Sequence, residues 1–234
     1  MIEDNLRLVE ERIARASSKV KRDPGEITLV AVTKGRASAQ IQEAIAAGIS
    51  DIGENKVQEA LSKYETVSFN RTPNTEHLTP IRWHMVGHLQ RNKAKNAVDI
   101  FDLIQSVDSL RLAQEIDKEA SKINKVQDIL IEVKTSGETA KFGLKPEETL
   151  EVIKEISGLK NISIKGLMTI APFSDNPEGS RSYFRRLREL KDKINGSRIT
   201  DYGLRILSMG MSDDFEVAIE EGSNMVRLGR AIFE

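Results

Sequence analysis

The stretch Ile27-Thr28-Leu29-Val30-Ala31-Val32-Thr33-Lys34-Gly35 is the starting point for interpreting the chain. It is rich in β-branched residues, it follows a turn at 23–25, and it has the length of a strand buried in a parallel sheet. The strand ends in a lysine followed by a glycine. Such a lysine either extends past the strand end into water or serves a chemical purpose. The rest of the chain decides between these two interpretations.

The composition of the 234-residue chain limits the class of protein. Lysine and arginine number 35 and aspartate and glutamate 36, so the net charge is −1, and no charged tail points to nucleic acid or an anionic membrane. The absence of cysteine excludes disulfides, thiolate catalysis and cysteine-bound metals. No run has the apolar length of a membrane span, and the acidic N-terminus is unlike a signal peptide. We therefore expect a cytoplasmic protein with neither nucleic acid nor a membrane as partner.

Helical and strand patterns alternate along the whole chain. Apolar residues recur every three or four positions from about residue 3 to 21, which predicts an amphipathic helix before the first strand. Further helices are expected at 38–47, 54–64, 90–96, 109–120, 146–157, 178–194 and 212–221. The other strands are expected at 49–53, 81–87, 100–107, 128–134, 164–170, 205–209 and 225–228. Ser38 and Ser109 are the expected N-caps, and residues 66–80, which lack periodicity, are expected to form a polar loop.

Eight strands alternating with helices predict a (β/α)₈ barrel, also called a TIM barrel. Strands separated by helices pair in parallel through right-handed crossovers, and eight such units in roughly 200 to 250 residues are typical of a closed barrel. An open doubly wound sheet is the alternative, because the same alternation suits both architectures. No Gly-x-Gly-x-x-Gly follows a strand, which counts against a dinucleotide fold. We expect one domain over residues 1–234.

In such a barrel the active site lies at the carboxyl ends of the strands, and loops after strands seven and eight often bind phosphate. If Lys34 points inward, alternation turns Val30 and Val32 inward too. In the barrel mouth the lysine amine loses hydration and becomes a nucleophile toward carbonyl groups, which suggests Schiff-base chemistry. On the opposite side, an anion site is expected from the Ser208 hydroxyl, from Gly210 and from the Gly229-Arg230 backbone.

Other polar residues give weaker indications. His84 and His88 straddle a strand end rather than share a helix face, and no nearby carboxylate completes a ligand set, so a metal site is not expected. His77 lies in the polar loop. The basic run 90–95 lacks the interleaved aromatic residues of a nucleic-acid surface. Three carboxylates near strand ends are either general bases or hydrogen-bonded loop residues, and they are Glu54, Asp108 and Glu132.

Six segments in this order resemble the pyridoxal phosphate homeostasis protein family. They are Lys34, 53–59 (GENKVQE), 83–93 (WHMVGHLQRNK), 166–170 (GLMTI), 207–214 (LSMGMSDD) and 227–229 (RLG). The resemblance spans almost the whole chain and implies an alanine-racemase-like barrel that carries pyridoxal 5′-phosphate (PLP) as a Schiff base on Lys34. The other residues implied are Asn55 near the ring oxygen, His84 and Met168 lining the pocket, Ser208 with Gly229 and Arg230 on the phosphate, and Arg227 at the pyridine nitrogen.

The chain departs from the family pattern at two places. Arg230 stands where a small hydroxyl residue is usual, and Thr33-Lys34-Gly35 replaces a common Lys-Thr-Lys-Pro ending of the first strand. The backbone contact of residue 230 with phosphate does not depend on its side chain, whereas a hydroxyl contact is lost.

The resemblance also implies a function. An arginine at the pyridine nitrogen keeps that nitrogen unprotonated and weakens the electron sink that most PLP enzymes need. We therefore expect a protein that stores or delivers PLP, with PLP-dependent apo-enzymes as recipients and little or no catalysis. The alternatives are a PLP-dependent amino-acid racemase or decarboxylase, and a cofactor-free lysine aldolase. Racemases with this barrel add a β-rich domain that supplies a tyrosine across a dimer, whereas this chain stops where the barrel closes, so we expect a monomer.

Overall fold

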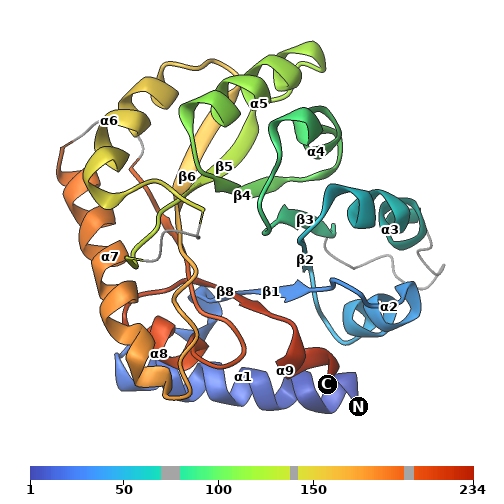
Figure 1. The fold of residues 1–234 in the computed structure, drawn as a ribbon. Coiled ribbons are helices and arrows are strands. Elements are labelled where there is room, and N and C mark those ends of the chain that lie inside the picture. Colours follow the sequence, from blue (N-terminus) through green and yellow to red (C-terminus); the bar gives the residue numbers. More distant parts are fainter. Residues whose placement is uncertain (70–79, 138–141, 198–202) are drawn as a thin grey trace.

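The computed structural model describes residues 1–69, 80–137, 142–197 and 203–234. Eight parallel strands form a closed barrel in chain order, with β8 paired to β1 (Figure 1). They are β1 (Thr28–Val32), β2 (Asp51–Glu54), β3 (Arg82–Met85), β4 (Leu103–Val107), β5 (Gln127–Glu132), β6 (Ile162–Met168), β7 (Ile206–Ser208) and β8 (Met225–Leu228). The predicted (β/α)₈ barrel is confirmed, and the open sheet is excluded.

Helices surround the outside of the barrel, and along the chain they alternate with the strands (Figure 1). They are α1 (Ile2–Lys19), α2 (Ser38–Ala46), α3 (Val57–Phe69), α4 (Ala94–Ile100), α5 (Leu110–Lys122), α6 (Pro146–Ser157), α7 (Arg181–Gly196), α8 (Phe215–Glu220) and α9 (Arg230–Phe233). Three short 3₁₀ turns join them, namely η1 (Pro24–Glu26), η2 (Arg91–Lys93) and η3 (Pro177–Ser180). None of the helices in the described residues is long and apolar enough to cross a membrane.

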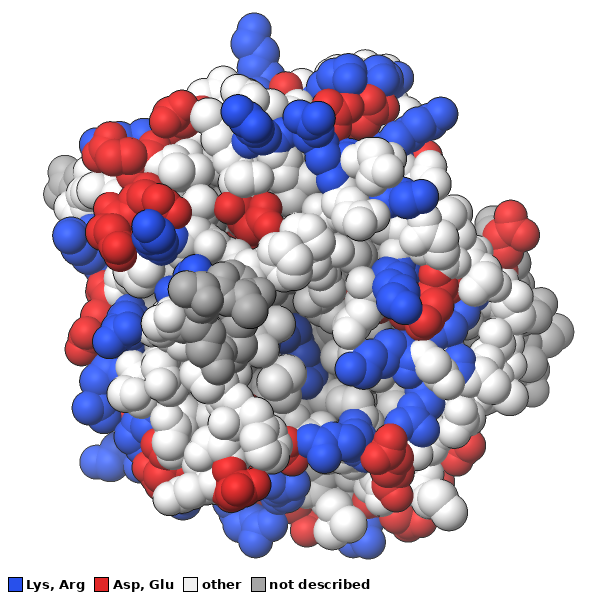
Figure 2. Space-filling model, in the orientation of Figure 1, with Lys and Arg blue, Asp and Glu red and all other residues white. Residues whose placement is uncertain are grey.

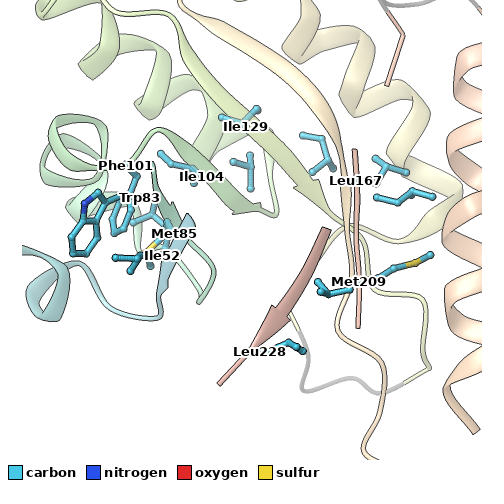
Figure 3. Close-up of a cluster of buried hydrophobic side chains, with 14 of the residues drawn as sticks. Ile52, Trp83, Met85, Phe101, Ile104, Ile129, Leu167, Met209 and Leu228 are labelled. Atoms are coloured by element: carbon cyan, nitrogen blue, oxygen red, sulfur yellow. The ribbon is translucent and has the colours of Figure 1, made fainter. Parts of the chain in front are cut away.

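Alternation along β1 divides the core into two parts, as predicted. Val30 and Val32 point into the barrel, where they pack with residues such as Leu103 and Met168. Leu29 and Ala31 point outward to the layer between the barrel and its helices. Figure 3 shows part of this outer layer, in which strand residues such as Ile52, Met85, Ile104 and Leu167 are fully buried. Two apolar faces on every strand explain why the strands are nearly continuous hydrophobic runs.

Element boundaries differ from the predictions where side chains cap helices in ways that the pattern does not reveal. Ser109 caps α5 as expected, since its hydroxyl accepts the Leu112 N–H at 3.3 Å. Ser38 is the first residue of α2 rather than its cap, and the Gln40 side chain instead accepts the Ala37 N–H. Helix α3 continues to Phe69, into the segment 66–80 that was predicted as a loop; residues 70–79, including His77, lie outside the described residues.

The two ends of the chain lie together on one side of the barrel (Figure 1). The amphipathic helix α1 packs against α8 and α9, and the Asn5 side chain donates a hydrogen bond of 3.0 Å to the Ile232 carbonyl. Arg12 and Lys19 add ion pairs to Glu216 and Glu220 of α8. The N-terminal helix therefore supports the elements that flank β8, whose carboxyl end borders the site described below.

Candidate functional site

A cavity of about 470 Å³ opens at the carboxyl ends of the strands. Its walls come from the segments that follow β1, β2, β3, β6, β7 and β8, so it lies where a barrel of this kind carries its active site. Five of the predicted site residues line it, namely Lys34, Asn55, Arg227, Gly229 and Arg230. Figure 2 shows Lys and Arg side chains bordering a hollow near the middle of this face. The cavity therefore suits an anionic ligand.

Lys34 lies at the end of β1, and hydrogen bonds on both sides fix the backbone around it. The Thr33 hydroxyl donates to Glu54 Oε1 at 2.5 Å, and Lys63 Nζ donates to the Thr33 carbonyl at 2.7 Å. On the other side, the Gly35 N–H donates to Glu59 at 3.2 Å. The Lys34 side chain is exposed while it lines the cavity, so its amine is less dehydrated than we predicted.

Glu54 and Lys63 form a buried ion pair beneath this turn. Lys63 Nζ lies 2.7 Å from Glu54 Oε1, and the Glu54 side chain is completely buried. Burial raises the pKa of the Glu54 carboxyl, against the hydrogen bonds from Lys63 and Thr33 that favour its charged form. Glu54 was predicted as a general base or a hydrogen-bonded loop carboxylate. Its contacts agree with the second role, because its Oε1 supports the strand end that carries Lys34.

The opposite wall is built by the segments after β7 and β8. Gly229 and Arg230 line the cavity together with Met211, Ser212 and Asp213. Arg230 is the first residue of α9, so its backbone N–H has no partner within that helix. The Arg230 side chain is held by Asp213, and Arg36 across the rim is held by Glu234. This wall offers backbone N–H groups and two arginines to an anion.

Arg227 forms the floor of the cavity. The side chain is 4% exposed, and its two terminal nitrogens donate to the Ser208 hydroxyl at 2.6 Å and the Thr169 carbonyl at 2.8 Å. Burial lowers the pKa of the Arg227 guanidinium to about 10, although the charges of Glu132 and Asp214 oppose the change. The group is still a cation at neutral pH. It therefore presents a fixed, buried positive charge to whatever occupies the cavity.

Four other predicted site residues do not line the cavity. His84, Met168 and Ser208 are completely buried below the Arg227 floor, because their side chains point into the packed interior of the barrel, where Met168 joins the inner apolar cluster and the other two bond to Gln105. The Ser208 hydroxyl is engaged by Arg227 and Gln105. Gly210 has a φ of +97°, and a Cβ there would lie 2.6 Å from the Ala218 side chain. Glycine is thus required at 210 for the turn and for the close approach of α8.

The two described histidines each pair with an aspartate, which the sequence did not reveal. His84 Nε2 lies 2.8 Å from Asp51 Oδ1, and His88 Nδ1 lies 3.3 Å from Asp108 Oδ2. The His88 ring also stacks on Phe142, with the ring centroids 3.6 Å apart. Among the residues that the structure describes, no group of three or more His, Asp or Glu side chains is arranged to hold a metal ion.

Several lining residues were missed at the sequence level. They are Val32, Arg36, Val86, Gly87, Ile170, Met211, Ser212, Asp213 and Glu234. Val86, Gly87, Ile170 and Met211 lie one to three residues beyond a strand end, so a wider window there would have included them, and Val32 is the last residue of β1. Arg36, Ser212, Asp213 and Glu234 lie four to six residues beyond a strand end, and only the fold places them at the cavity.

Comparisons with known proteins agree with this architecture. The family model "alanine racemase, N-terminal domain" matches residues 5–234. A "pyridoxal phosphate homeostasis protein" of Aquifex aeolicus is 42% identical over 230 residues, which cover 98% of this chain and 96% of the relative. The structure of PipY from Synechococcus elongatus with PLP bound matches with a TM-score of 0.83 and 31% identity, over the full length of both chains.

A more distant neighbour shows the fold alone. An alanine racemase from Clostridium difficile has a TM-score of 0.74 at 16% identity, covering 98% of this chain and 59% of the racemase. The near-complete matches to the relatives above are far closer in sequence. The chain therefore belongs to the pyridoxal phosphate homeostasis protein family, whose barrel is of the alanine racemase N-terminal type.

Proposed function

We propose that the protein binds PLP as a Schiff base on Lys34 and holds it for storage or for delivery to PLP-dependent apo-enzymes in the cytoplasm. One observation carries the proposal: the Lys34 amine and the cationic wall after β8 share one cavity. The names of the relatives and the PLP bound in PipY support it. The protein needs no second subunit for this task, and we propose that it acts as a monomer.

The residues of the cavity fit PLP in size and charge. A volume of about 470 Å³ is within the usual range for small-molecule sites. The phosphate is an anion, and the Gly229-Arg230 backbone with the Arg230 side chain offers it donors and positive charge. Arg230 replaces the small hydroxyl residue usual in the family, and a charged donor substitutes for the lost hydroxyl contact.

Each of the other residues then has a separate task. When bound, PLP supplies an aldehyde for covalent attachment and an electron-withdrawing ring. Lys34 provides the attacking amine, held by the hydrogen bonds on Thr33 and Gly35. Asn55 and Arg227 both line the cavity. Asn55 would lie near the ring oxygen of bound PLP, and Arg227 would present N–H groups to the ring nitrogen. A cation at that nitrogen excludes a proton from it, so the bound ring is a poor electron sink.

The described acids that line the cavity, Asp213 and Glu234, are each paired with an arginine, which supports a carrier rather than a racemase. A two-base racemase needs a second proton-transfer group facing the lysine. Tyr64 packs against Trp83 with ring centroids 5.4 Å apart, and Tyr183 packs against the outer hydrophobic layer. Neither of these tyrosines lines the cavity. We therefore propose that turnover of amino acids is low.

The proposal is tested by titrating the purified protein with PLP and following the visible absorbance of the Schiff base. Wild type should develop the band, and borohydride should convert it into a stable adduct that mass spectrometry locates on the Lys34 peptide. Lys34→Ala should show neither. Lys56→Ala is the matched control, because Lys56 is an exposed lysine next to Asn55 that does not line the cavity. Wild type that takes up no PLP would contradict the proposal.

The carrier role needs a separate experiment. The loaded protein is incubated with D- and L-amino acids while optical rotation and carbon dioxide are measured, and then with an apo-enzyme whose activity depends on PLP. We expect negligible racemisation or decarboxylation and a gain of activity in the apo-enzyme. Rapid turnover of amino acids would instead support the racemase or decarboxylase alternative.

A further inference from the structure

Five polar side chains form one continuous hydrogen-bonded chain through the barrel interior. We call it the relay, and its members in order are Arg227, Ser208, Gln105, His84 and Asp51. The successive distances are 2.6, 2.6, 2.9 and 2.8 Å. The three middle members are completely buried, and the two ends are 4% and 6% exposed. The relay runs from the cavity floor on β8 to the first residue of β2.

Hydrogen-bond chemistry fixes the direction of every link. Arginine is only a donor, so the Ser208 oxygen accepts from it and the Ser208 hydrogen is available for Gln105 Oε1. The Gln105 amide nitrogen therefore faces His84 Nδ1 and the Met225 sulfur, at 2.9 and 3.2 Å. Because Nδ1 must accept, the proton of a neutral His84 is on Nε2, from which it is donated to Asp51.

The relay is not a route for protons. A glutamine amide accepts at oxygen and donates at nitrogen, and it does not pass a proton from one to the other under ordinary conditions. The consequence of the relay is therefore electrostatic and positional. Its aligned dipoles all turn their negative ends toward Arg227, and they strengthen one another in a dry interior.

This arrangement compensates a buried cation without giving it a carboxylate of its own. No ion pair within 4 Å joins Arg227 to a described carboxylate, and its side chain donates to the neutral Ser208 hydroxyl and the Thr169 carbonyl. A direct carboxylate partner would occupy two guanidinium N–H groups at once. The relay instead occupies one guanidinium N–H group, the one that donates to Ser208. Its carboxylate, Asp51, lies at the far end of the barrel, so other N–H groups of Arg227 are left to face the cavity.

We propose that Gln105, His84 and Asp51 are positioning residues that hold Arg227 as a hydrogen-bond donor to an unprotonated ring nitrogen of the ligand. The inference rests on the proposed function, since the ring nitrogen belongs to PLP. It assigns a task to three buried residues that do not touch the cavity. It also explains why His84 lies below the cavity floor rather than in its wall.

The test uses PLP and an analogue in which a CH group replaces the ring nitrogen. Wild type should bind PLP at least about tenfold more tightly than the analogue, the effect of one hydrogen bond with a charged donor. In Gln105→Met the relay is cut next to Ser208, and the preference for PLP should fall to near unity. Gln127→Met is the matched control, because Gln127 is an equally buried glutamine on β5 that bonds only to backbone carbonyls. Gln127→Met should lower the stability of the protein but keep its preference for PLP over the analogue.

A second readout does not involve the ligand. With only three histidines in the chain, ¹⁵N NMR can identify the His84 ring, which should be neutral with its proton on Nε2. Gln105→Glu keeps the shape but offers only acceptors, so it should move a proton onto Nδ1. A preference for PLP that survives both Gln105 variants, or an Nδ1–H tautomer in wild type, would overturn the relay. Failure of wild type to take up PLP would instead overturn the proposed function.

Discussion

Gly87 determines where the backbone of Asn55 can lie. A Cβ at residue 87 would lie 2.4 Å from the Asn55 carbonyl oxygen and 2.8 Å from its Cα, and the backbone has no freedom to move away cheaply. Both residues line the cavity. Glycine at 87 is therefore a steric requirement of the site rather than a feature of a turn.

This contact predicts that Gly87→Ala displaces Asn55 and weakens PLP uptake. We expect a loss of about 1 to 3 kcal/mol in the free energy of unfolding, as for other overpacked positions, together with a lower affinity for PLP in the absorbance titration. Gly196→Ala is the control, since nothing lies within 4 Å of its added Cβ at the end of α7. Equal affinities in the two variants would show that the Asn55 position does not matter to the ligand.

Glu132 makes stability depend on pH in the neutral range. Burial raises the pKa of Glu132 to about 7, the charge of Asp108 adds to the shift, and Arg227 opposes it. The folded state thus binds a proton more tightly than the unfolded chain, whose pKa is near 4.5. The stability that protonated Glu132 contributes to the folded state is complete below a pH of 4.5, and it is lost as the pH rises through about 7.

We therefore expect Glu132→Gln to gain stability relative to wild type between pH 5 and pH 8. At roughly 1.4 kcal/mol per pKa unit, the difference between the two proteins should change by up to about 3 kcal/mol. Urea unfolding of the ligand-free proteins at both pH values measures it. Glu151→Gln, at an exposed position on α6, should show no such change. A pH-independent difference for Glu132→Gln would contradict the raised pKa.

Single residues at the strand ends could be predicted from the sequence, while their partners could not. Lys34 and Arg227 were predicted at the mouth of the barrel because each lies at or near the end of an apolar strand, and the barrel brings those strand ends together. Gln105 lies within Leu-Ile-Gln-Ser-Val, which the pattern indicates only as a strand. Its contacts with His84 and Ser208 depend on strand register and tilt across the barrel, and no local pattern contains that information.

Between helices α7 and α8, a cluster of charges around Glu221 joins two elements that are otherwise packed by apolar residues. Three arginines of α7 contact this carboxylate, which is 3% exposed: Arg181 at 3.2 Å, Arg185 at 2.8 Å and Arg188 at 3.0 Å. Burial alone would raise the pKa of Glu221, but the hydrogen bonds from Arg185 and Arg181 and the charge of Arg188 outweigh it and lower the pKa.

Glu221→Gln should therefore destabilise the protein at neutral pH by about 2 kcal/mol, less than for a fully buried pair because the arginines are partly exposed. A lowered pKa gives stability that is present above the ordinary value and is lost as the pH falls, so the difference from wild type should shrink in acid. Urea unfolding at pH 7 and at pH 4 measures both effects. Glu189→Gln, exposed on α7, is the control. A loss that stays constant in acid would rule out the charge cluster as its cause.

At the level of elements, type and order were predictable, and boundaries were less so. All eight strands and the helices between them follow from periodicity and turn residues. The expected strand at 100–107 begins only at Leu103, because α4 continues to Ile100, and α8 begins at Phe215 rather than Ser212. In the second case the Asp214 side chain accepts the Met211 N–H at 2.7 Å and holds the preceding residues in a turn.

At the level of the whole molecule, α1 has a larger role than the packing that its amphipathic pattern predicts. It contacts α8 and α9, and α9 begins at Arg230 in the cavity wall. Closure of the barrel between β8 and β1 places the two ends of the chain side by side, so the first helix supports the last elements. The stability of the cavity wall should thus depend on residues far from the cavity.

Leu6 and Leu8 provide a matched pair on α1 for testing this dependence. Leu6 is 3% exposed in the core layer, and Leu8 is 50% exposed two positions further along the same helix. Leu6→Ala should lower the free energy of unfolding by about 2 to 5 kcal/mol, whereas Leu8→Ala should change it little. If α1 supports the cavity wall, hydrogen exchange in Leu6→Ala should accelerate in α8, β8 and α9 more than in β4 and β5, and PLP affinity should fall with it. Uniform acceleration throughout the barrel would show instead that α1 contributes only to global stability, because the wall then opens no earlier than the rest of the fold.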